Sequence, residues 1–375
     1  MMSLKDTTNT KFDSLDALRF IAFIRIFLLH IPNSYNLPLF EKIKTGGEIG
    51  VDFFFVLSGF LITYLLAKEK YQSGTVDAKR FMMRRIFRIW PLYYLGVSLA
   101  YANYYIGQHY GLGNHLGYNP NILFSATFTE NIKMIMEDNF PNGAPLRVFW
   151  SLCVEEQFYI LWIILFKFVP LKHILKVFGG LIITAWCYRI LITPLLHNTM
   201  MTDTDLISKL DYFCIGGALA ICMVTYPSVT KKMQQLLNPQ LQLPILCACF
   251  FFFFFVQVFP QVVMRNPIYF PTLSAIVFTV LIASMVLPGA VYHISNHSLL
   301  GKWGNMSYGL YVYHTPVILA LLMVFKPVQG GNAWLYTIGF TLSAFIITLL
   351  ISYASYYFFE KPFLNVRSKY FPKTA

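Results

Sequence analysis

Arg19 and His30 are two ionisable residues within one apolar stretch, residues 15–31. Eleven positions turn an α-helix through about three turns plus 20°, so both side chains project from one face, roughly 16 Å apart along the axis. Ionisable groups on a membrane-grade helix are costly and indicate a functional site. Alone, Arg19 would be explained by contact with lipid headgroups and His30 by capping of the segment. Together they predict a site.

The composition predicts an all-α polytopic membrane protein. The chain has 375 residues, of which 57% are hydrophobic and 12% charged, and its mean hydropathy is positive. Ordinary globular packing does not bury this much apolar surface. The net charge of +12 is interpreted through its distribution along the chain, and no nucleic-acid partner is expected. The six cysteines lie in or beside apolar runs, without the spacing of a disulfide framework or a metal site.

About ten apolar runs are long enough to cross a bilayer. They cover about residues 14–32, 47–67, 89–108, 150–169, 177–197, 210–226, 243–259, 268–288, 303–325 and 334–359. Lys and Arg are concentrated in the connections on the side of the two termini, which predicts that both termini are cytoplasmic. We therefore expect a single integral membrane domain over 1–375. It would have short cytoplasmic tails at 1–13 and 360–375, and an outer loop at about 107–149 that forms a lid or a partly re-entrant segment.

The second and third spans carry charged residues near their ends. Asp52 lies at the outer end of the second span, at a depth similar to His30. It would either orient the His30 imidazole or cap its own helix, and the sequence does not decide between the two. Arg84 and Arg88 share one helix face at the cytoplasmic start of the third span, where Pro91 is interpreted as a helix-start signal. These arginines either bind phosphates or report only topology and anionic lipid.

The fourth and ninth spans add candidate catalytic residues. Glu155 and Glu156 are adjacent in an apolar helix, so one is expected to face inward and function, and the other to lie nearer the rim. Ser307 and His314 are seven residues apart, two turns and nearly one face. Alone, His314 would be typical of a histidine that forms a hydrogen bond between helices. Pro362 is interpreted as the terminator of the tenth helix.

The charged residues are therefore polarised along the predicted membrane axis. The predicted inner mouth is cationic and contains Arg19, Arg84, Arg88 and Lys361. The predicted outer cluster contains His30, Asp52, Glu155 and His314. Such a gradient predicts a cytoplasmic polyanionic donor whose reactive end reaches deep into the membrane. Acyl-coenzyme A has that shape, and we expect it as a substrate with no permanently bound cofactor and no metal.

Six segments, in chain order, resemble the integral membrane acyltransferase type 3 family, which includes bacterial O-antigen and exopolysaccharide O-acetyltransferases. They are LDALRFIA from Leu15 with His30 following Arg19, GVDFFFVLSGFLI from Gly50, RRIFRIWP from Arg84, WSLCVEEQFY from Trp150, SYGLYVYH from Ser307 and EKPF from Glu360. Each motif is weakly specific by itself. Six in order, over nearly the whole chain, are specific for the family.

The resemblance implies ten spans in a bacterial cytoplasmic membrane and a cytoplasmic acyl-CoA donor. It implies transfer of an acetyl or similar group to a hydroxyl of an envelope glycan or glycolipid. It carries the family's functional Arg and His of the first span onto Arg19 and His30, and its paired arginines onto Arg84 and Arg88. Some members have an extra soluble hydrolase-like domain after the last span. No fused soluble domain is expected here, so such a step would need an envelope-biosynthesis partner protein.

Two positions depart from the family pattern. Ala17 stands where members usually have Gly, and members usually lack a charge at the position of Arg25. Arg25 is six residues past Arg19 and so points away from the Arg19 face. It is expected either to pair with a carboxylate such as Glu155 or Glu48, or to bind an anionic donor such as succinyl-CoA.

The expected chemistry is acyl transfer with His30 as general base on the acceptor hydroxyl, and with Asp52 or Glu155 orienting or stabilising its imidazolium. A covalent acyl-enzyme on His30 or Ser307 is the other route. The alternative from another class is a proton-coupled transporter or flippase of a glycan- or acyl-linked lipid, with His30 and Glu155 as a proton relay. That alternative explains the buried ionisable groups, but not the cationic inner mouth.

Overall fold

The computed structural model describes residues 12–110, 117–259, 266–327 and 331–372, and its regular structure there is helical, as predicted. The long helices are α1 (Ser14–His30), α3 (Ile49–Ser73), α4 (Ala78–His109), α7 (Trp150–Phe168), α8 (Leu171–Cys187), α11 (Leu210–Thr225), α13 (Pro239–Phe254), α15 (Tyr269–Val286), α17 (Ser307–Val324) and α18 (Ala333–Ser355). The shorter helices are α2 (Pro38–Lys44), α5 (Ile122–Ala126), α6 (Glu130–Glu137), α9 (Thr193–Leu196), α10 (Thr199–Thr204), α12 (Pro227–Leu236), α16 (Leu299–Asn305) and α19 (Lys361–Tyr370). Single turns of 3-10 or π helix are η2 (Leu146–Val148), η3 (Tyr188–Ile192), η4 (Ile207–Lys209), η5 (Val256–Val258) and η6 (Tyr356–Glu360). Residues 1–11 and 373–375 of the predicted tails, and residues 111–116 of the predicted outer loop, lie outside the described residues.

Polar caps set the ends of several of these apolar helices. The Asp77 carboxylate accepts from the backbone N–H of Arg80 at the start of α4, 2.9 Å away. Asn332 accepts in the same way from the N–H of Leu335 at the start of α18. Such side chains satisfy backbone donors that have no partner within the helix. Gly74, in the left-handed region at φ 77°, ends α3.

Two prolines have roles that differ from the prediction. The third long helix starts at Ala78, so Pro91 lies inside α4 and is not in its first turn. The basic residues before Pro91 are therefore helical, and packing fixes the direction of each one. Pro362 does not end the chain's helical structure: α18 continues through η6 into α19, where Pro362 is in the first turn.

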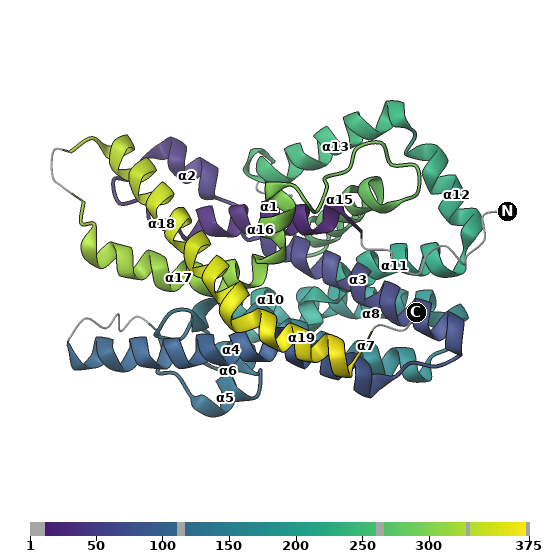
Figure 1. The fold of residues 1–375 in the computed structure, drawn as a ribbon, viewed down its shortest axis with the longest axis horizontal. Helices are drawn as coiled ribbons and strands as arrows, with labels where there is room; N and C mark the ends of the chain where they lie inside the picture. Colours follow the sequence, from purple (N-terminus) through teal and green to yellow (C-terminus); the bar gives the residue numbers. More distant parts are fainter. Residues whose placement is uncertain (1–11, 111–116, 260–265, 328–330, 373–375) are drawn as a thin grey trace.

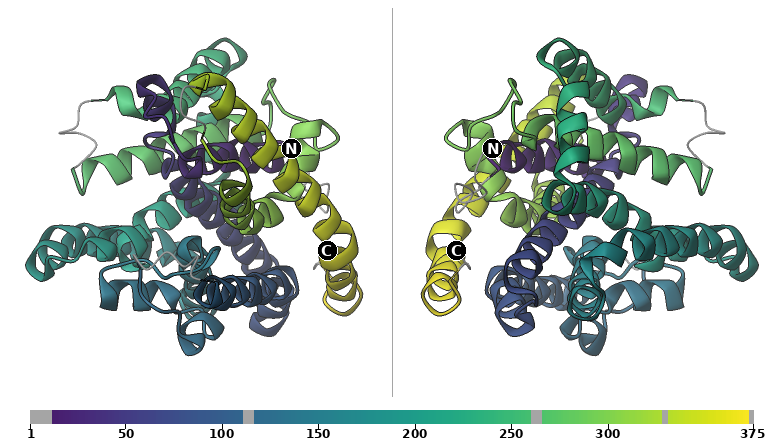
Figure 2. Two further views of the ribbon diagram at one scale, coloured as in Figure 1. Left: turned by 90° about the vertical axis from the view of Figure 1, so that its left-hand side faces the viewer. Right: turned by 90° about the vertical axis from the view of Figure 1, so that its right-hand side faces the viewer.

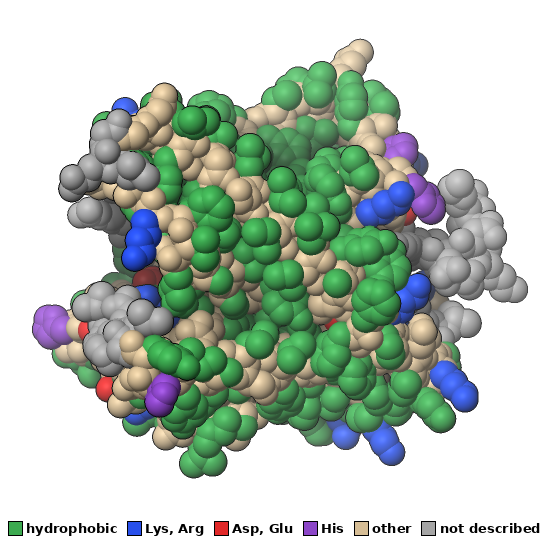
Figure 3. All heavy atoms as spheres, turned by 60° about the vertical axis from the view of Figure 1, so that its left-hand side comes forward, with side chains coloured by type: hydrophobic (Ala, Val, Ile, Leu, Met, Phe, Trp, Pro, Cys, Tyr) green, Lys and Arg blue, Asp and Glu red, His purple; other side chains and the backbone are tan. Residues whose placement is uncertain are grey.

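The structure is that of a multi-pass membrane protein. Six described helical stretches are long and apolar enough to cross a bilayer: Pro38–Ser73, Leu171–Leu196, Ile207–Thr225, Tyr269–Val286, Ser307–Val324 and Ala333–Tyr370. If the pair α12 and α13, which is bent by 83°, is counted as one span, the number of candidate spans rises to seven. Figure 3 shows hydrophobic side chains over most of one face, with Lys and Arg toward two opposite edges.

The ten predicted spans all fall on helical segments, but three of them are not among these stretches. α1 has only 17 residues, α7 carries two glutamates and a lysine, and α4 is rich in arginine and tyrosine. Each has a physical reason to depart from a plain lipid-spanning helix, because each contributes polar groups to the interior. The count of ten spans and the cytoplasmic placement of the termini stay predictions.

α1 is the central element of the arrangement in Figure 1. One side of it, with Leu18, Ala22 and Ile26, belongs to the large apolar core built with α3, α4, α7, α8, α11 and α15. Another side, with Phe23 and Phe27, belongs to a second core built with α17 and α18. Figure 2 shows α18 and α19 along one side of the molecule and α8 protruding on the other. α1 therefore joins the two cores.

α3 and α11 approach closely through glycine. A Cβ on Gly59 of α3 would lie 2.3 Å from the carbonyl oxygen of Phe213, and a Cβ on Gly216 of α11 would lie 2.2 Å from that of Val56. Small residues at a membrane helix interface allow backbones to approach in this way. This contact fixes α3, whose N-terminal half carries much of the wall of the cavity described next.

Candidate active site

A cavity of about 110 Å³ lies among α1, α3, α4, α7 and α17. Its lining combines apolar side chains of α3 with polar and charged side chains from the other four helices. The residues that line it are Arg19, Val51, Phe54, Phe55, Leu57, Ser58, Leu61, Ile62, Arg85, Arg88, Ile89, Ser151, Leu152, Glu155, Tyr159, Ser307, Tyr308 and Tyr311. This volume is sufficient for several water molecules or for a small reacting group.

Three guanidinium groups and one carboxylate give the cavity its charge. Arg19 forms an ion pair with Asp16, one turn earlier on α1. Arg85 lies over the Tyr159 ring, with 5.3 Å between its Cζ and the ring centroid, and Arg88 is exposed, so the cavity is open on that side. Three cations in a partly dehydrated site favour an anionic ligand.

Glu155 and Ser307 both line the cavity, as an inward-facing pair of candidates would. Glu155 accepts hydrogen bonds from the Ser58 hydroxyl and from the Tyr159 hydroxyl, the latter at 2.5 Å. The adjacent Glu156 is not near the rim, contrary to prediction. It is buried, and its carboxylate is 3.3 Å from the indole N–H of Trp90, because α7 packs on α4 at this point.

The arginines of α4 differ from the predicted set in one position. Arg85 and Arg88, three residues apart, face the cavity. Arg84 is turned about 100° from Arg85 around the helix, and its guanidinium donates to the backbone carbonyl of Phe371 after α19. Spacing alone does not separate these cases, because positions three and four apart both share a face. Arg85 is therefore the residue of this motif that sequence analysis missed.

His30 and His314 form a contact between α1 and α17. Nε2 of His314 lies 3.3 Å from Nδ1 of His30. Nδ1 of His314 lies 2.7 Å from the Tyr311 carbonyl, and Nδ1 of His30 lies 2.8 Å from the Ile26 carbonyl. A carbonyl only accepts, so we assign the proton of each ring to Nδ1. His30 Nδ1–H then points to both the Ile26 carbonyl and the His314 lone pair, and His30 Nε2 carries a lone pair of its own.

Tyr311 connects the cavity to this histidine pair. Its side chain lines the cavity, and its hydroxyl lies 2.8 Å from the Val148 carbonyl and 2.6 Å from the Ser151 hydroxyl. Its backbone carbonyl holds the fully buried His314. Sequence analysis missed Tyr311, although its spacing of three residues from His314 and four from Ser307 places all three on one helix face.

Asp52 lies neither in the cavity nor beside the histidine pair, so its predicted place in the outer cluster is wrong. Its carboxylate is 3.9 Å from the Lys209 ammonium, and it interacts with the Tyr212 hydroxyl of α11. Among the described residues it contacts no histidine, and its side chain does not cap its own helix. The reason is the direction of the side chain around its helix. Asp52 has the depth expected for a partner of His30, but it faces α11 and not α1.

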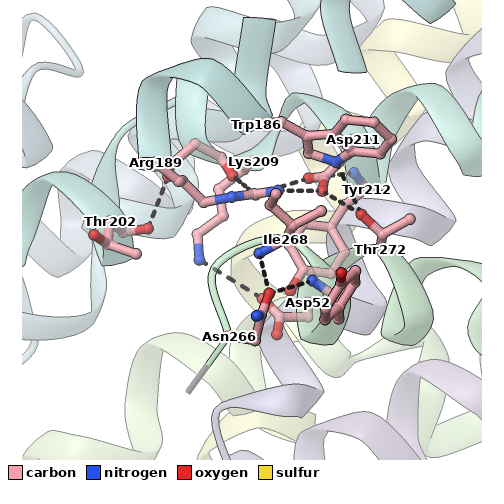
Figure 4. Close-up of polar contacts among 12 residues, drawn as sticks. Asp52, Trp186, Arg189, Thr202, Lys209, Asp211, Tyr212, Asn266, Ile268 and Thr272 are labelled. Carbon is pink, nitrogen blue, oxygen red and sulfur yellow. Dashed lines mark hydrogen bonds and ion pairs between the residues drawn. The ribbon is translucent and has the colours of Figure 1, made fainter. Parts of the chain in front are cut away.

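Figure 4 shows that Asp52 belongs to a charged network around the start of α11. The Arg189 guanidinium, on η3, binds both carboxylate oxygens of Asp211 at 3.1 and 2.6 Å. Both side chains are almost fully buried. The Thr272 hydroxyl is 3.4 Å from Asp211 and accepts from the Trp186 indole. This network joins α3, α8, α11 and α15, so its evident role is to hold these helices together.

Arg25 binds backbone and not a carboxylate. Its guanidinium donates to the carbonyls of Ile43 at 2.7 Å and Thr45 at 3.0 Å, at the C-terminal end of α2. Carbonyls at a helix C-terminus lack partners and carry partial negative charge, so a cation is favourable there. The predicted pairing with Glu155 is wrong, and Glu48 acts on Arg25 only at longer range.

The predicted outer loop is a packed segment in its described part. The buried carboxylate of Glu130, on α6, accepts from the Tyr118 hydroxyl at 2.5 Å and from the Ser125 hydroxyl at 2.6 Å. Burial raises the pKa of Glu130, and the two hydroxyl donors oppose that shift. α6 packs against α7 and α10, which places this network behind the helix that carries Glu155.

Comparison with known proteins identifies the family. The sequence model of a family described as an acyltransferase domain, acyltransferase 3, matches residues 12–357. The chain belongs to the acyltransferase 3 family. The family and the enzyme class predicted from the sequence, acyltransferase, are confirmed.

Named relatives of this acyltransferase are similar over most of its length. Peptidoglycan O-acetyltransferase OatA of Listeria monocytogenes is 29% identical over 367 residues, 93% of this chain and 55% of the relative. Putative peptidoglycan O-acetyltransferase YrhL of Bacillus subtilis is 26% identical over 362 residues, 93% of this chain and 54% of the relative. A putative O-acetyltransferase of Staphylococcus aureus strain MRSA252 is 28% identical over 385 residues, 96% of this chain and 59% of the relative. The chain thus spans little more than half the length of these relatives. No solved structure matches it.

Proposed function

We propose that this acyltransferase moves an acetyl group from a cytoplasmic acyl-CoA, as substrate, to a hydroxyl of an envelope glycan. The observation that carries the proposal is the cationic cavity, with Arg19, Arg85 and Arg88 on one side and Tyr311 leading to the His30–His314 pair. The relatives named as peptidoglycan O-acetyltransferases support a glycan acceptor. The proposed location is the bacterial cytoplasmic membrane, with both termini inside.

In this proposal the arginines hold the anionic part of the donor and His30 activates the acceptor. Arg19, Arg85 and Arg88 face the cavity, and Arg84 acts outside it. His30 Nε2 takes the proton of the acceptor hydroxyl, whose oxygen attacks the thioester carbonyl. The C–S bond then breaks, and the sulfur leaves as a thiol with the proton that His30 returns. His30 Nδ1–H already donates to Ile26 and His314, so these acceptors stabilise the imidazolium that forms.

Glu155 and Ser307 have different supporting roles. Glu155, bound by two hydroxyl groups, balances the cavity's positive charge and fixes the position of Tyr159. Ser307 lies in the cavity at the start of α17 and is the proposed carrier if transfer has a covalent step. Asp52 is left out of the mechanism, because its partners Lys209 and Tyr212 belong to the network at α11.

The experiment is acetyl transfer by the purified protein in lipid nanodiscs. Radiolabelled acetyl-CoA and an envelope glycan extract are added to the wild type, to Arg19→Ala and to His30→Ala, with the exposed His293→Ala as control. Label is expected in glycan with the wild type and the control, and not with the other two variants. Acceptor-dependent release of coenzyme A excludes the transporter alternative, because a transporter releases none. Full transfer by His30→Ala would remove His30 from the mechanism.

A further inference from the structure

α19 is docked on the helix that carries the cavity arginines. The Arg84 guanidinium donates to the Phe371 carbonyl, and the Phe371 ring lies 6.0 Å from the Phe87 ring, centroid to centroid. Figure 1 shows α19 beside the first half of α4. The last described helix therefore lies against the helix that carries Arg85 and Arg88, although none of its own residues lines the cavity.

This docking brings a guanidinium of α19 to those of Arg84, Arg85 and Arg88 on α4. Arg367 of α19 is half-buried, and its Nε is buried without a hydrogen-bond partner among the described residues. The charged groups that act most strongly on Arg367 are Arg84, Arg85 and Arg88. All of these are cations, so their fields oppose its charge.

Carboxylates near Arg85 and Arg88 offset their positive charge, whereas Arg84 and Arg367 have no such carboxylate among the described residues. Arg85 lies in the field of Glu155 and Glu156, and Arg88 in that of Glu360. By contrast, the charged groups acting on Arg84 are other arginines. Within the described part of the chain, neither Arg84 nor Arg367 forms an ion pair. Like charges brought together and partly dehydrated destabilise the fold unless an anion binds them.

We propose that Arg84 and Arg367 form a phosphate site at the mouth of the cavity, with α19 as part of the donor-binding surface. Guanidinium groups on two facing helices match the planar, bidentate recognition of a phosphate. The proposal rests on the proposed function, because the phosphate that reaches this mouth is that of the acyl-CoA. Arg85 and Arg88 then receive the part of the donor nearer the thioester. A lipid headgroup phosphate has the same chemistry, and the experiment separates the two sources.

The test measures binding of 3′-phosphoadenosine 5′-phosphate, which carries nucleotide phosphates without the acyl arm, to the protein in phosphatidylcholine nanodiscs. Arg367→Ala is expected to weaken binding roughly tenfold to a hundredfold, the loss of one hydrogen bond to a charged group. Arg367→Lys keeps the charge and is expected to retain part of the affinity. Lys369→Ala, an exposed cation on the same helix, is the matched control and stays within twofold of the wild type.

Kinetics and lipid binding supply the remaining outcomes. For the wild type and Arg367→Ala, transfer is compared with acetyl-CoA and with S-acetylpantetheine, which lacks the nucleotide. A raised KM for acetyl-CoA and an unchanged rate with S-acetylpantetheine support the site.

Retention of phosphatidylglycerol by the wild type but not by Arg367→Ala, with nucleotide binding unchanged, assigns the phosphate to lipid and overturns the donor role. Equal nucleotide binding and equal lipid retention overturn the site itself. Absence of transfer by the wild type from either donor contradicts the proposed function and not the site, which the binding arm tests separately.

Discussion

Replacement of His314 tests whether the histidine pair is a working unit or only a packing contact. His314 is completely buried, and its Nε2 is an acceptor for the Nδ1–H of His30. His314→Ala removes that acceptor and leaves His30 with the Ile26 carbonyl alone. Under the proposed function His30 becomes an imidazolium during transfer, so the lost interaction is stronger in the transition state than in the ground state.

The magnitude follows from the one hydrogen bond involved. A hydrogen bond to a charged group contributes about 1.5–3 kcal/mol, which corresponds to a fall in kcat of roughly tenfold to a hundredfold. The 3.3 Å separation and the shared donor favour the lower end of that range. KM for the acyl donor is expected to stay unchanged, because the arginines that bind the donor belong to the cavity and do not contact His314.

Two further variants separate positioning from packing. His314→Gln can place an amide oxygen near the Nε2 position and is expected to recover part of kcat. His314→Asn can keep only the donor to the Tyr311 carbonyl and is expected to resemble His314→Ala. The assay is steady-state acetyl transfer in nanodiscs, with each variant first shown to be monodisperse. A folded His314→Ala protein with wild-type kcat, or an equal loss in Gln and Asn variants, would refute the assigned tautomers and the role of the pair.

Two other predictions concern stability. Gly216→Ala is expected to lower the thermal unfolding midpoint, because its Cβ would meet the Val56 carbonyl at 2.2 Å. The expected overpacking cost is about 1–3 kcal/mol. Gly179→Ala on α8, where a Cβ meets nothing within 4 Å, is the matched control and should be neutral or stabilising. An equal effect of both changes would contradict the described α3–α11 contact. Burial raises the pKa of Glu130 above its ordinary value of 4.5, so its contribution to stability is present below about pH 4.5 and is lost as the pH rises through the raised value. Unfolding midpoints measured across this range should fall with pH in the wild type more than in Glu130→Gln, and parallel curves would show that this carboxyl does not titrate differently in the folded state.

The sequence predicted the helical class and the family, and its placement of candidate site residues failed where the direction of a side chain around its helix decides the contact. Hydrophobic runs and charges give the depth of a residue along a helix, and depth correctly grouped His30 with His314. Depth does not say which neighbour a side chain faces, so Asp52 was placed with His30 although it faces Lys209 on the α11 side. The same limit explains the choice of Arg84 over Arg85, since both share a face with Arg88 and only the packing of α7 and α19 distinguishes them.

Helix boundaries were the second source of error, and their cause is local. Prolines were interpreted as boundaries because an interior proline removes a backbone hydrogen bond. α4 remains helical through Pro91 because other contacts hold the helix on both sides of this proline. These contacts are the Asp77 cap before it and the packing of Tyr93 against Phe128 and Phe149 after it. After α18, the helical structure passes through the π turn η6 into α19, where Pro362 lies in the first turn and its missing N–H costs no hydrogen bond. Neither compensation is visible in the motif itself.

The two ends of α1 serve different parts of the proposed reaction, and the fold explains how one helix can do both. Arg19 faces the cavity with the arginines of α4, whereas His30, roughly 16 Å further along the axis, contacts α17. Between them Arg25 points elsewhere, to the end of α2, and adds no charge to this line. The connection therefore runs along α17, from Ser307 past Tyr311 to His314. Under the proposed function, a donor entering at the arginines and an acceptor entering at His30 would meet beside Tyr311. The charged phosphates of the donor then do not have to cross the apolar centre of the membrane.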